Sequence, residues 1–196
     1  MTDIVLFHHV MGLTDGVRHF ADRLADGRHR VHTPDLYAGR VARSLEEGFA
    51  VRDEIGTQTI AERVDAAIAE VSDGVVFAGI SMGVMTAQRL AQTRPGAAGA
   101  LLYASCVPIT GADAFGPWPD GVRVQIHGMD DDEFFAHEGD LDAARELVDV
   151  VGAERADVFT YSGDQHLFMD DSLDTYDAEV TALVLQRSQR FLDAVD

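Results

Sequence analysis

The fold is decided by the stretch Val75-Val76-Phe77-Ala78-Gly79-Ile80-Ser81-Met82-Gly83-Val84. Four apolar residues lead into Gly79, and beyond Gly83 further apolar residues recur at helical spacing. This order predicts a buried strand, a very tight turn with Ser81 at its apex, and then a helix. The two glycines suit such a turn because they let neighbouring backbone pass close by.

A serine at the apex of this kind of turn is a candidate nucleophile. The turn lifts the Ser81 hydroxyl above the sheet and brings the N–H of Met82, at the helix start, beside any oxyanion formed there. The G-x-S-x-G pattern is short and occurs by chance in many chains, so the flanking strand and helix are the context that supports it. The rest of the chain must supply a base, an acid and a second oxyanion donor.

Composition narrows the class of protein. With 196 residues the chain is most simply one domain, over residues 1–196. The formal charge of −19 disfavours nucleic acid and anionic membrane surfaces as partners. The single cysteine excludes an internal disulfide framework. No signal peptide or membrane-length apolar run is visible, so we expect a soluble cytoplasmic protein, whose oligomeric state the sequence does not indicate.

Strand patterns alternate with helix patterns along the whole chain, which predicts a mostly parallel sheet of about six strands with helices on both faces. The chain is therefore predicted to be a three-layer α/β protein. Strands are expected at 4–7, 30–33, 75–78, 99–105, 122–127 and 157–161, and helices at 17–26, 45–51, 57–71, 84–91, 141–151 and 176–194.

Polar candidates gather after the strand ends, where parallel sheets bind ligands. The chain order Ser, Asp, His expected for this turn leaves His137 and His166 as possible bases. His137 lies in an acidic, solvated stretch, whereas His166 follows the sixth strand and can reach back over Ser81, so we predict His166 as the base. Its acid comes from Asp130–Asp132, three consecutive aspartates that spacing alone does not separate.

The loop His8–Gly12 follows the first strand and is expected to supply the second oxyanion donor, the N–H of Val10 or a neighbour. His8 and His9 are adjacent, so they point to opposite sides, and no third ligand lies nearby in sequence. We therefore predict no metal site, and no organic cofactor is implied.

These motifs together resemble the dienelactone hydrolase family of α/β-hydrolases, and the resemblance covers nearly the whole length. It implies an α/β-hydrolase fold that begins directly at the first strand, with Asp132 rather than Asp131 as the acid. The motifs that carry it are His8–Gly12, Pro34-Asp35-Leu36-Tyr37, Gly79–Gly83, His127–Phe134 and Gly163-Asp164-Gln165-His166-Leu167-Phe168.

Three positions depart from the family pattern. Ser81 stands where dienelactone hydrolase carries a cysteine, and His9 stands where that cysteine has a glutamate partner. Asp170, four residues after the predicted base, stands where the enzyme has a substrate-binding arginine, which removes a partner for the dienelactone carboxylate. Arg40, Arg43 or Arg52 could replace that arginine, although each is more simply a surface residue.

The sequence therefore predicts a serine hydrolase that cleaves a small carboxylic ester or lactone through Ser81, His166 and Asp132, with Val10 and Met82 as oxyanion donors. The short loop at 106–121 leaves no room for a large lid, which favours small substrates. Alternatives are a thioesterase or small peptidase on the same triad, a catalytically silent ligand-binding relative, and a flavodoxin-like binding module. The predicted pocket residues are His9, Trp118, Phe134 and Phe168.

Overall fold

The computed structural model describes residues 1–112 and 114–195. Its strands are β1 (Asp3–Phe7), β2 (Arg30–His32), β3 (Val75–Ile80), β4 (Ala97–Tyr103), β5 (Arg123–Met129) and β6 (Ala156–Tyr161). They form one sheet in the order β2-β1-β3-β4-β5-β6, and every neighbouring pair is parallel. All six strands therefore end at the same edge of the sheet.

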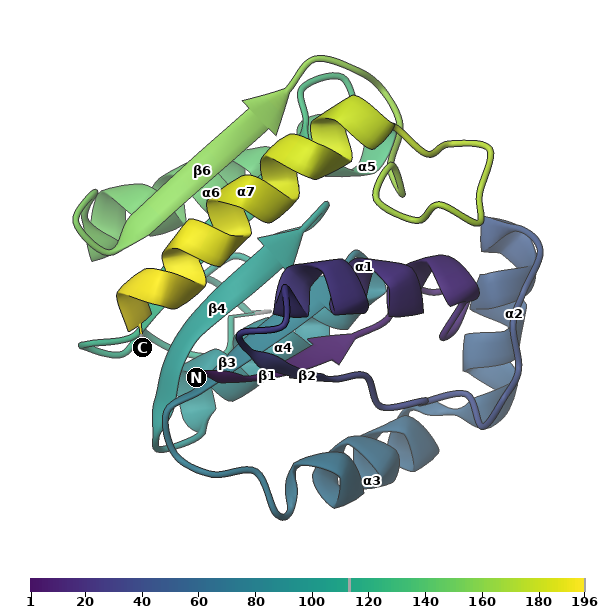
Figure 1. The fold of residues 1–196 in the computed structure, drawn as a ribbon, viewed down its shortest axis with the longest axis horizontal. Coiled ribbons are helices and arrows are strands. Elements are labelled where there is room, and N and C mark those ends of the chain that lie inside the picture. Colours follow the sequence, from purple (N-terminus) through teal and green to yellow (C-terminus); the bar gives the residue numbers. More distant parts are fainter. Residues whose placement is uncertain (113, 196) are drawn as a thin grey trace.

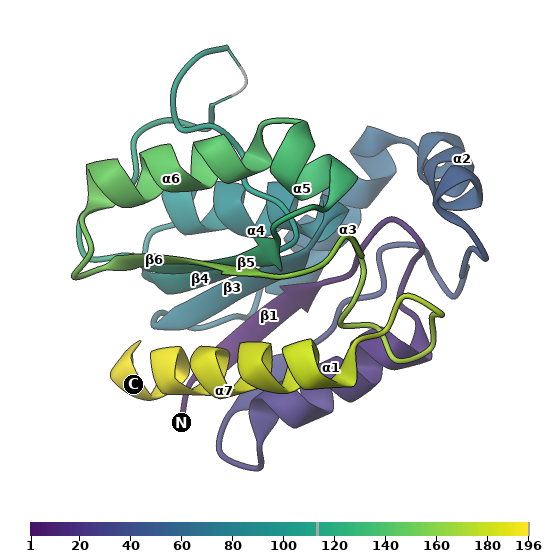
Figure 2. The ribbon, with the colours of Figure 1, turned by 90° about the horizontal axis from the view of Figure 1, so that it is seen from above.

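Helices cover both faces of this sheet. They are α1 (Asp15–Ala25), α2 (Leu45–Ile55), α3 (Thr57–Ile68), α4 (Met82–Thr93), α5 (Glu133–His137), α6 (Asp140–Val151) and α7 (Ala178–Val195). Figures 1 and 2 show α1 and α7 on one face and α4 and α6 on the other. The three-layer α/β arrangement predicted from the sequence is confirmed. Within the described residues, no helix combines the length and the apolar character needed to cross a bilayer.

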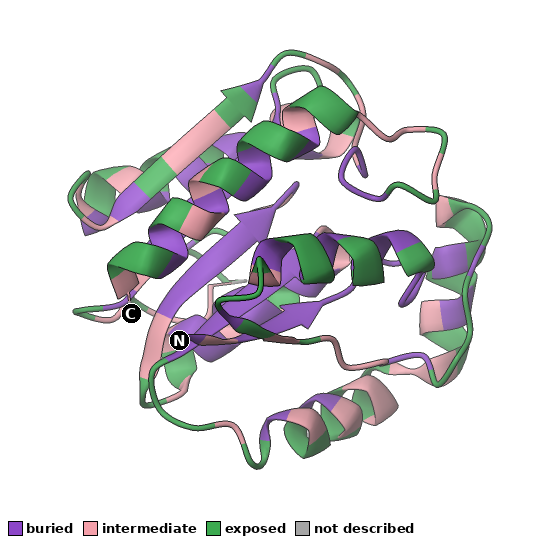
Figure 3. Ribbon diagram, in the orientation of Figure 1, coloured by how far each residue is buried: buried purple, intermediate pink, exposed green. Residues whose placement is uncertain are grey.

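Two apolar cores lie on the two faces. Because β3 is covered on both sides, all six of its residues are buried, as its continuous apolar pattern predicts (Figure 3). Phe77 faces the core under α3, α4 and α6, whereas Val76 and Ala78 face the core under α1 and α7. The edge strand β6 is less buried than the inner strands.

One element was not predicted from the sequence. The stretch after the fifth strand, interpreted as a loop, contains the five-residue helix α5. A helix of this length has too few residues for a helical period to show in the sequence. It begins at Asp132, whose side chain caps it by accepting a hydrogen bond from the Phe134 N–H.

The turn between β3 and α4 depends on its two glycines. A Cβ atom at Gly83 would lie 2.2 Å from the carbonyl oxygen of Phe7, and one at Gly79 would lie 2.4 Å from the carbonyl of Gly83. The last residue of β1 and the first turn of α4 are thus in backbone contact. This contact places the loop after β1 directly beside Ser81.

Replacing Gly83 with alanine tests this contact. Because the added methyl group meets backbone that cannot turn aside, we expect Gly83→Ala to lower the free energy of unfolding by about 1–3 kcal/mol or more. Gly27→Ala is the control, since its methyl group meets open space and costs only about 1 kcal/mol of left-handed backbone strain. Urea unfolding of both variants measures the difference, and equal losses would contradict the packing argument.

Candidate active site

Ser81 occupies the sharp turn between β3 and α4. Its φ of 51° and ψ of −117° lie in a region that non-glycine residues rarely adopt. Two backbone hydrogen bonds hold it there: the Ser81 N–H donates to the Tyr103 carbonyl at 2.7 Å, and the Val84 N–H donates to the Ser81 carbonyl at 2.8 Å. The strained conformation turns the hydroxyl group toward a pocket at the carboxyl edge of the sheet.

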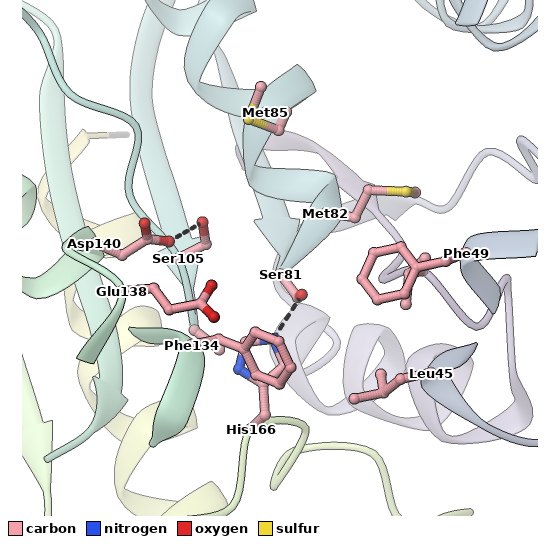
Figure 4. A pocket seen from close by; sticks show the side chains of 12 residues that line it. Leu45, Phe49, Ser81, Met82, Met85, Ser105, Phe134, Glu138, Asp140 and His166 are labelled. Atoms are coloured by element: carbon pink, nitrogen blue, oxygen red, sulfur yellow. Dashed lines mark hydrogen bonds between the residues drawn. The ribbon is translucent and has the colours of Figure 1, made fainter. Parts of the chain in front are cut away.

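His166 and Asp132 continue from this hydroxyl group. The Ser81 Oγ lies 2.7 Å from Nε2 of His166 (Figure 4). On the other side of the ring, Nδ1 of His166 lies 2.7 Å from Oδ2 of Asp132. The Asp132 side chain is fully buried and that of His166 is 12 % exposed. A protonated Nδ1 donating to Asp132 leaves Nε2 free to accept the proton of the serine hydroxyl.

The three consecutive aspartates have different partners. Asp132 is turned inward by its position at the start of α5 and accepts the His166 hydrogen bond. Asp131 is exposed and lies 2.9 Å from His137, which is also exposed. His137, the alternative base, therefore pairs with Asp131, the alternative acid, on the surface and away from Ser81.

The loops that carry Asp132 and His166 are joined to each other. The Asp131 N–H donates to the Gly163 carbonyl at 2.9 Å, and the Gly163 N–H donates to Oδ1 of Asp130 at 3.1 Å. These bonds connect the end of β5 to the turn after β6. The separation of Asp132 and His166 is thus fixed by backbone as well as by their own hydrogen bond.

The N–H groups of Val10 and Met82 are available as oxyanion donors. Both residues line the pocket with Ser81. Within the described part of the chain, neither N–H donates a hydrogen bond to another protein group. The Val10 loop is held closely, because a Cβ at Gly48 of α2 would lie 2.6 Å from the Val10 carbonyl. Two unpaired donors beside a serine hydroxyl suit a developing oxyanion.

His8 supports this loop from inside. It is fully buried, and burial lowers its pKa to about 4, so the ring is neutral at pH 7. Its Nδ1–H donates to the His9 carbonyl at 2.7 Å, and its Nε2 accepts from the Leu36 N–H at 3.2 Å. His8 therefore connects the loop after β1 to the Pro34–Tyr37 turn and is not presented to the pocket.

His9 is also turned away from the pocket, contrary to the sequence prediction. It is fully buried, with Nε2 2.8 Å from Oδ2 of Asp170 and Nδ1 accepting from the Met11 N–H at 3.3 Å. The reason is the buried carboxylate of Asp170, which holds the ring below the loop. The pair joins the segment after His166 to the loop that carries Val10.

Asp170 is a buried and fully hydrogen-bonded carboxylate. Besides His9, it accepts from the Thr14 hydroxyl at 2.5 Å, the Ser172 hydroxyl at 2.5 Å and the Ser172 N–H at 2.9 Å. Burial by itself would raise its pKa, but the bonds from His9, Ser172 and Thr14 outweigh burial and lower the pKa to about 2. Asp170 is therefore an anion at neutral pH.

The pocket above Ser81 is small, with a volume of about 150 Å³. Figure 4 shows Leu45 and Phe49 of α2 on one side of the serine, with Asp140 and Glu138 on the other. Burial raises the pKa of Asp140, which accepts from the Ser105 hydroxyl at 2.6 Å and the Cys106 N–H at 3.2 Å. The full lining is Val10, Leu45, Phe49, Ser81, Met82, Met85, Ala104, Ser105, Phe134, Glu138, Asp140 and His166.

Among the other predicted pocket residues, only Phe134 lines this pocket, with its ring centroid 4.6 Å from that of His166. Trp118 lies in the loop before β5, where its side chain packs into the core and donates its Nε1–H to the Val122 carbonyl at 2.9 Å. Phe168 is fully buried in the core under α1 and α7, because the chain turns inward directly after His166. Trp118 and Phe168 therefore pack in the cores and do not contact a ligand in this pocket.

Several lining residues were missed from the sequence. Leu45 and Phe49 lie on a helix whose apolar pattern is too weak to show which side faces the pocket. Glu138 and Asp140 reach the pocket only because the short helix α5 turns the chain back over the carboxyl edge of the sheet.

Comparison with known proteins identifies the family. Residues 1–195 match the model of the Dienelactone hydrolase family. The chain belongs to the dienelactone hydrolase family. No curated protein sequence matches it significantly.

Solved structures similar to this member of the dienelactone hydrolase family confirm its α/β-hydrolase fold. A dienelactone hydrolase-like promiscuous phosphotriesterase, P91, from metagenomic libraries is 19 % identical, with a TM-score of 0.72 over 100 % of this chain and 87 % of that one. Esterase 2 of Thermogutta terrifontis is 15 % identical, with a TM-score of 0.64 over 99 % and 83 %. The thioesterase domain from the curacin biosynthetic pathway is 16 % identical, with a TM-score of 0.60 over 94 % and 90 %.

Replacing Asp170 with asparagine tests the buried pair. The pKa of Asp170 in the folded protein lies below its ordinary value of 3.8. Its carboxylate therefore stabilises the folded state fully above about pH 4, and this stabilisation is lost as the pH falls through about 2. We expect Asp170→Asn to cost roughly 2 kcal/mol at pH 7, and the difference from the parent to shrink below pH 4.

Denaturant unfolding at a series of pH values measures this effect. Asp174→Asn, at an exposed position in the same segment, is the control and should leave stability nearly unchanged at every pH. A loss for Asp170→Asn that stays constant down to pH 2 would show that the carboxylate charge contributes nothing.

Proposed function

We propose that the protein hydrolyses small carboxylic esters or lactones through an acyl-enzyme on Ser81. The single observation that supports this most is the hydrogen-bonded series from Ser81 Oγ to His166 Nε2 and from His166 Nδ1 to Asp132, with 2.7 Å in each step. Two unpaired backbone N–H groups lie in the same pocket. Membership of the dienelactone hydrolase family supports the same class of reaction.

In the acylation step, Ser81 Oγ forms a bond to the substrate carbonyl carbon while its proton passes to Nε2 of His166. The buried carboxylate of Asp132 stabilises the resulting imidazolium. The N–H groups of Val10 and Met82 donate to the oxyanion. His166 then returns the proton to the leaving alkoxide oxygen as the ester C–O bond breaks.

In the deacylation step, a water molecule replaces the alcohol. His166 takes a proton from that water as the oxygen attacks the acyl carbon, and returns it to Ser81 Oγ when the acyl bond breaks. The products are a carboxylate and the free alcohol. For a lactone, both groups are on one product molecule.

The lining of the pocket narrows the substrate. A volume of about 150 Å³ suits a short acyl group better than a long chain. No arginine lines this pocket within the described residues. Arg40 and Arg52 form salt bridges with Glu54 and Asp53, and Arg43 lines a neighbouring pocket that shares Leu45 and His166 with this one. Glu138 and Asp140 instead place negative charge at the wall. We therefore propose neutral esters or lactones, rather than the carboxylate-bearing dienelactone, as substrates.

A fluorophosphonate probe tests the nucleophile. We expect Ser81 Oγ to displace fluoride and form a stable phosphonyl ester, which mass spectrometry locates on the peptide that carries Ser81. Ser81→Ala should abolish labelling, and Asp132→Asn should lower kcat for nitrophenyl acetate by roughly 1,000-fold or more. The matched control is Asp131→Asn, in the exposed Asp131–His137 pair. It should leave both the labelling of Ser81 and the kcat for nitrophenyl acetate nearly unchanged. An unlabelled but folded protein would contradict the proposal and favour a silent ligand-binding relative.

A panel of neutral nitrophenyl esters, lactones and acyl thioesters separates ester hydrolysis from thioester hydrolysis. We expect kcat/KM to be highest for the short neutral esters or lactones, because the pocket that contains Ser81 is small. Turnover restricted to thioesters would replace the proposal by a thioesterase activity on the same serine.

The charge of the pocket wall is tested with two esters of one alcohol. We expect the enzyme to cleave nitrophenyl acetate faster than nitrophenyl hemisuccinate, whose acyl group carries a carboxylate. Glu138→Gln should raise kcat/KM for the hemisuccinate about fivefold and leave the acetate nearly unchanged, because one unit of repulsion is removed. Glu133→Gln, on the exposed part of α5, is the control. Equal effects of the two substitutions would contradict a specific role of Glu138.

A further inference from the structure

A second pocket lies on the sheet face under α7, at the edge opposite Ser81. Its volume is about 330 Å³. Arg123 and Gln125 come from the start of β5, Phe159 comes from the edge strand β6, and Arg187 and Arg190 come from the second half of α7. In Figure 1, α7 runs alongside β6, which is an edge strand of the sheet. The complete lining is Arg123, Gln125, Glu154, Arg155, Asp157, Phe159, Arg187, Arg190, Phe191 and Ala194.

Arginine is concentrated in this pocket. The chain has only 15 basic residues against 34 acidic ones, yet four arginines line this one pocket. Within the described residues, none of the four forms a salt bridge with a carboxylate, although Glu154 and Asp157 lie in the same lining. In a chain this acidic, four arginines without a paired carboxylate mark a local reversal of charge.

Arg187 is already oriented toward the pocket. Its guanidinium lies 4.2 Å from the ring centre of Phe159 and 5.1 Å from that of Tyr161. Stacking on two aromatic rings, together with a hydrogen bond to the Tyr161 side chain, restricts the plane of the guanidinium, whose five N–H donors are more than this one bond requires. Arg123 and Arg155 are similarly restrained, because each donates one hydrogen bond to a backbone carbonyl, that of Glu154 and that of Val151.

The floor of the pocket carries an unpaired donor. Gln125 is 5 % exposed, and its Oε1 accepts from Nε2 of His127 at 2.8 Å. His127 is held in this neutral form because burial lowers its pKa to about 3, and its Nδ1 accepts from the Tyr161 hydroxyl at 2.8 Å. The amide nitrogen of Gln125 has no hydrogen-bond partner among the described residues, so its N–H groups are available to whatever occupies the pocket.

We propose that this pocket binds a small organic anion, a carboxylate or phosphate attached to a planar apolar group. The oxyanion would accept from the guanidinium groups of Arg187 and Arg190 and from the amide of Gln125, since arginine matches the geometry of both oxyanions. Phe159 and Phe191 supply the apolar surface for the planar group. The net charge of −19 repels anions from the rest of the surface, so binding is confined to this pocket.

Titration of the isotopically labelled protein with phenyl phosphate and benzoate, followed by NMR, tests the site. We expect saturable binding, with the largest shifts at amides of β6 and the second half of α7. The ratio of the two dissociation constants shows whether phosphate or carboxylate is preferred. Benzyl alcohol should not bind, since it carries the planar group without the anion, and inorganic phosphate should bind more weakly.

Variants assign the binding to the arginines. We expect Arg190→Gln, at an exposed position, to raise the dissociation constant of the better anion about tenfold. Arg187→Lys keeps the charge but loses the stacked planar group, and should also weaken binding. Arg18→Gln, exposed on α1 with no side-chain partner among the described residues, removes the same charge and should change nothing. Ser81→Ala should bind as well as the parent, so the outcome is independent of the proposed hydrolysis.

Three results would overturn the proposal. One is the absence of saturable binding by either anion. Another is a set of shifts confined to the Ser81 pocket, which would show binding of a product-like carboxylate there. The third is an equal loss of affinity in Arg190→Gln and Arg18→Gln, which would show a general effect of net charge.

Discussion

The end of β1 and the start of α4 are in backbone contact, and only glycine at position 83 permits that contact. A side chain there would enter the carbonyl of Phe7, and separating the two elements would move the loop after β1 away from Ser81. The same contact keeps Val10 and Met82 in the lining of one small pocket. The two proposed oxyanion donors are therefore positioned by the packing of a strand against a helix.

A buried hydrogen-bonded network holds the other side of that loop. His9 and Asp170 occupy the two positions at which the chain departs from the glutamate and arginine expected of dienelactone hydrolase, and they lie 2.8 Å apart. The two departures therefore meet in one contact, which joins the loop after β1 to the segment after His166. Because Asp170 also accepts hydrogen bonds from Thr14 and Ser172, its carboxylate is satisfied inside the protein and is not presented to a substrate.

The strength of each sequence signal explains what could be predicted. The turn around Ser81 is local, so its strand, helix and glycines could be recognised from adjacent residues, and the order of elements followed from alternating apolar periods. The acid is different, because Asp130, Asp131 and Asp132 have the same chemistry and neighbouring positions. What separates them is the start of α5, which turns Asp132 inward and leaves Asp131 exposed beside His137. Only the resemblance to the family had indicated that choice.

The aromatic residues show the limit of the same reasoning. Trp118, Phe134 and Phe168 all lie outside the strands and helices predicted from the sequence, and composition gives no direction for their side chains. Phe134 covers His166 because it lies in the first turn of α5, whereas Phe168 follows a chain that has already turned into the core. The direction of a large side chain in a loop depends on tertiary packing, which a local pattern does not contain.

Charge connects the pocket to the reaction we propose. Hydrolysis of a neutral ester creates a carboxylate in a space whose wall already carries Glu138 and Asp140. Repulsion between these groups is absent for the substrate and present for the acid product, so it weakens product binding without weakening substrate binding. An arginine in the same place would have the opposite effect and retain the product. The acidic wall therefore favours release of the carboxylate product. A substrate that already carries a carboxylate is repelled on entry as well, so for such a substrate the wall weakens the binding of substrate and product alike.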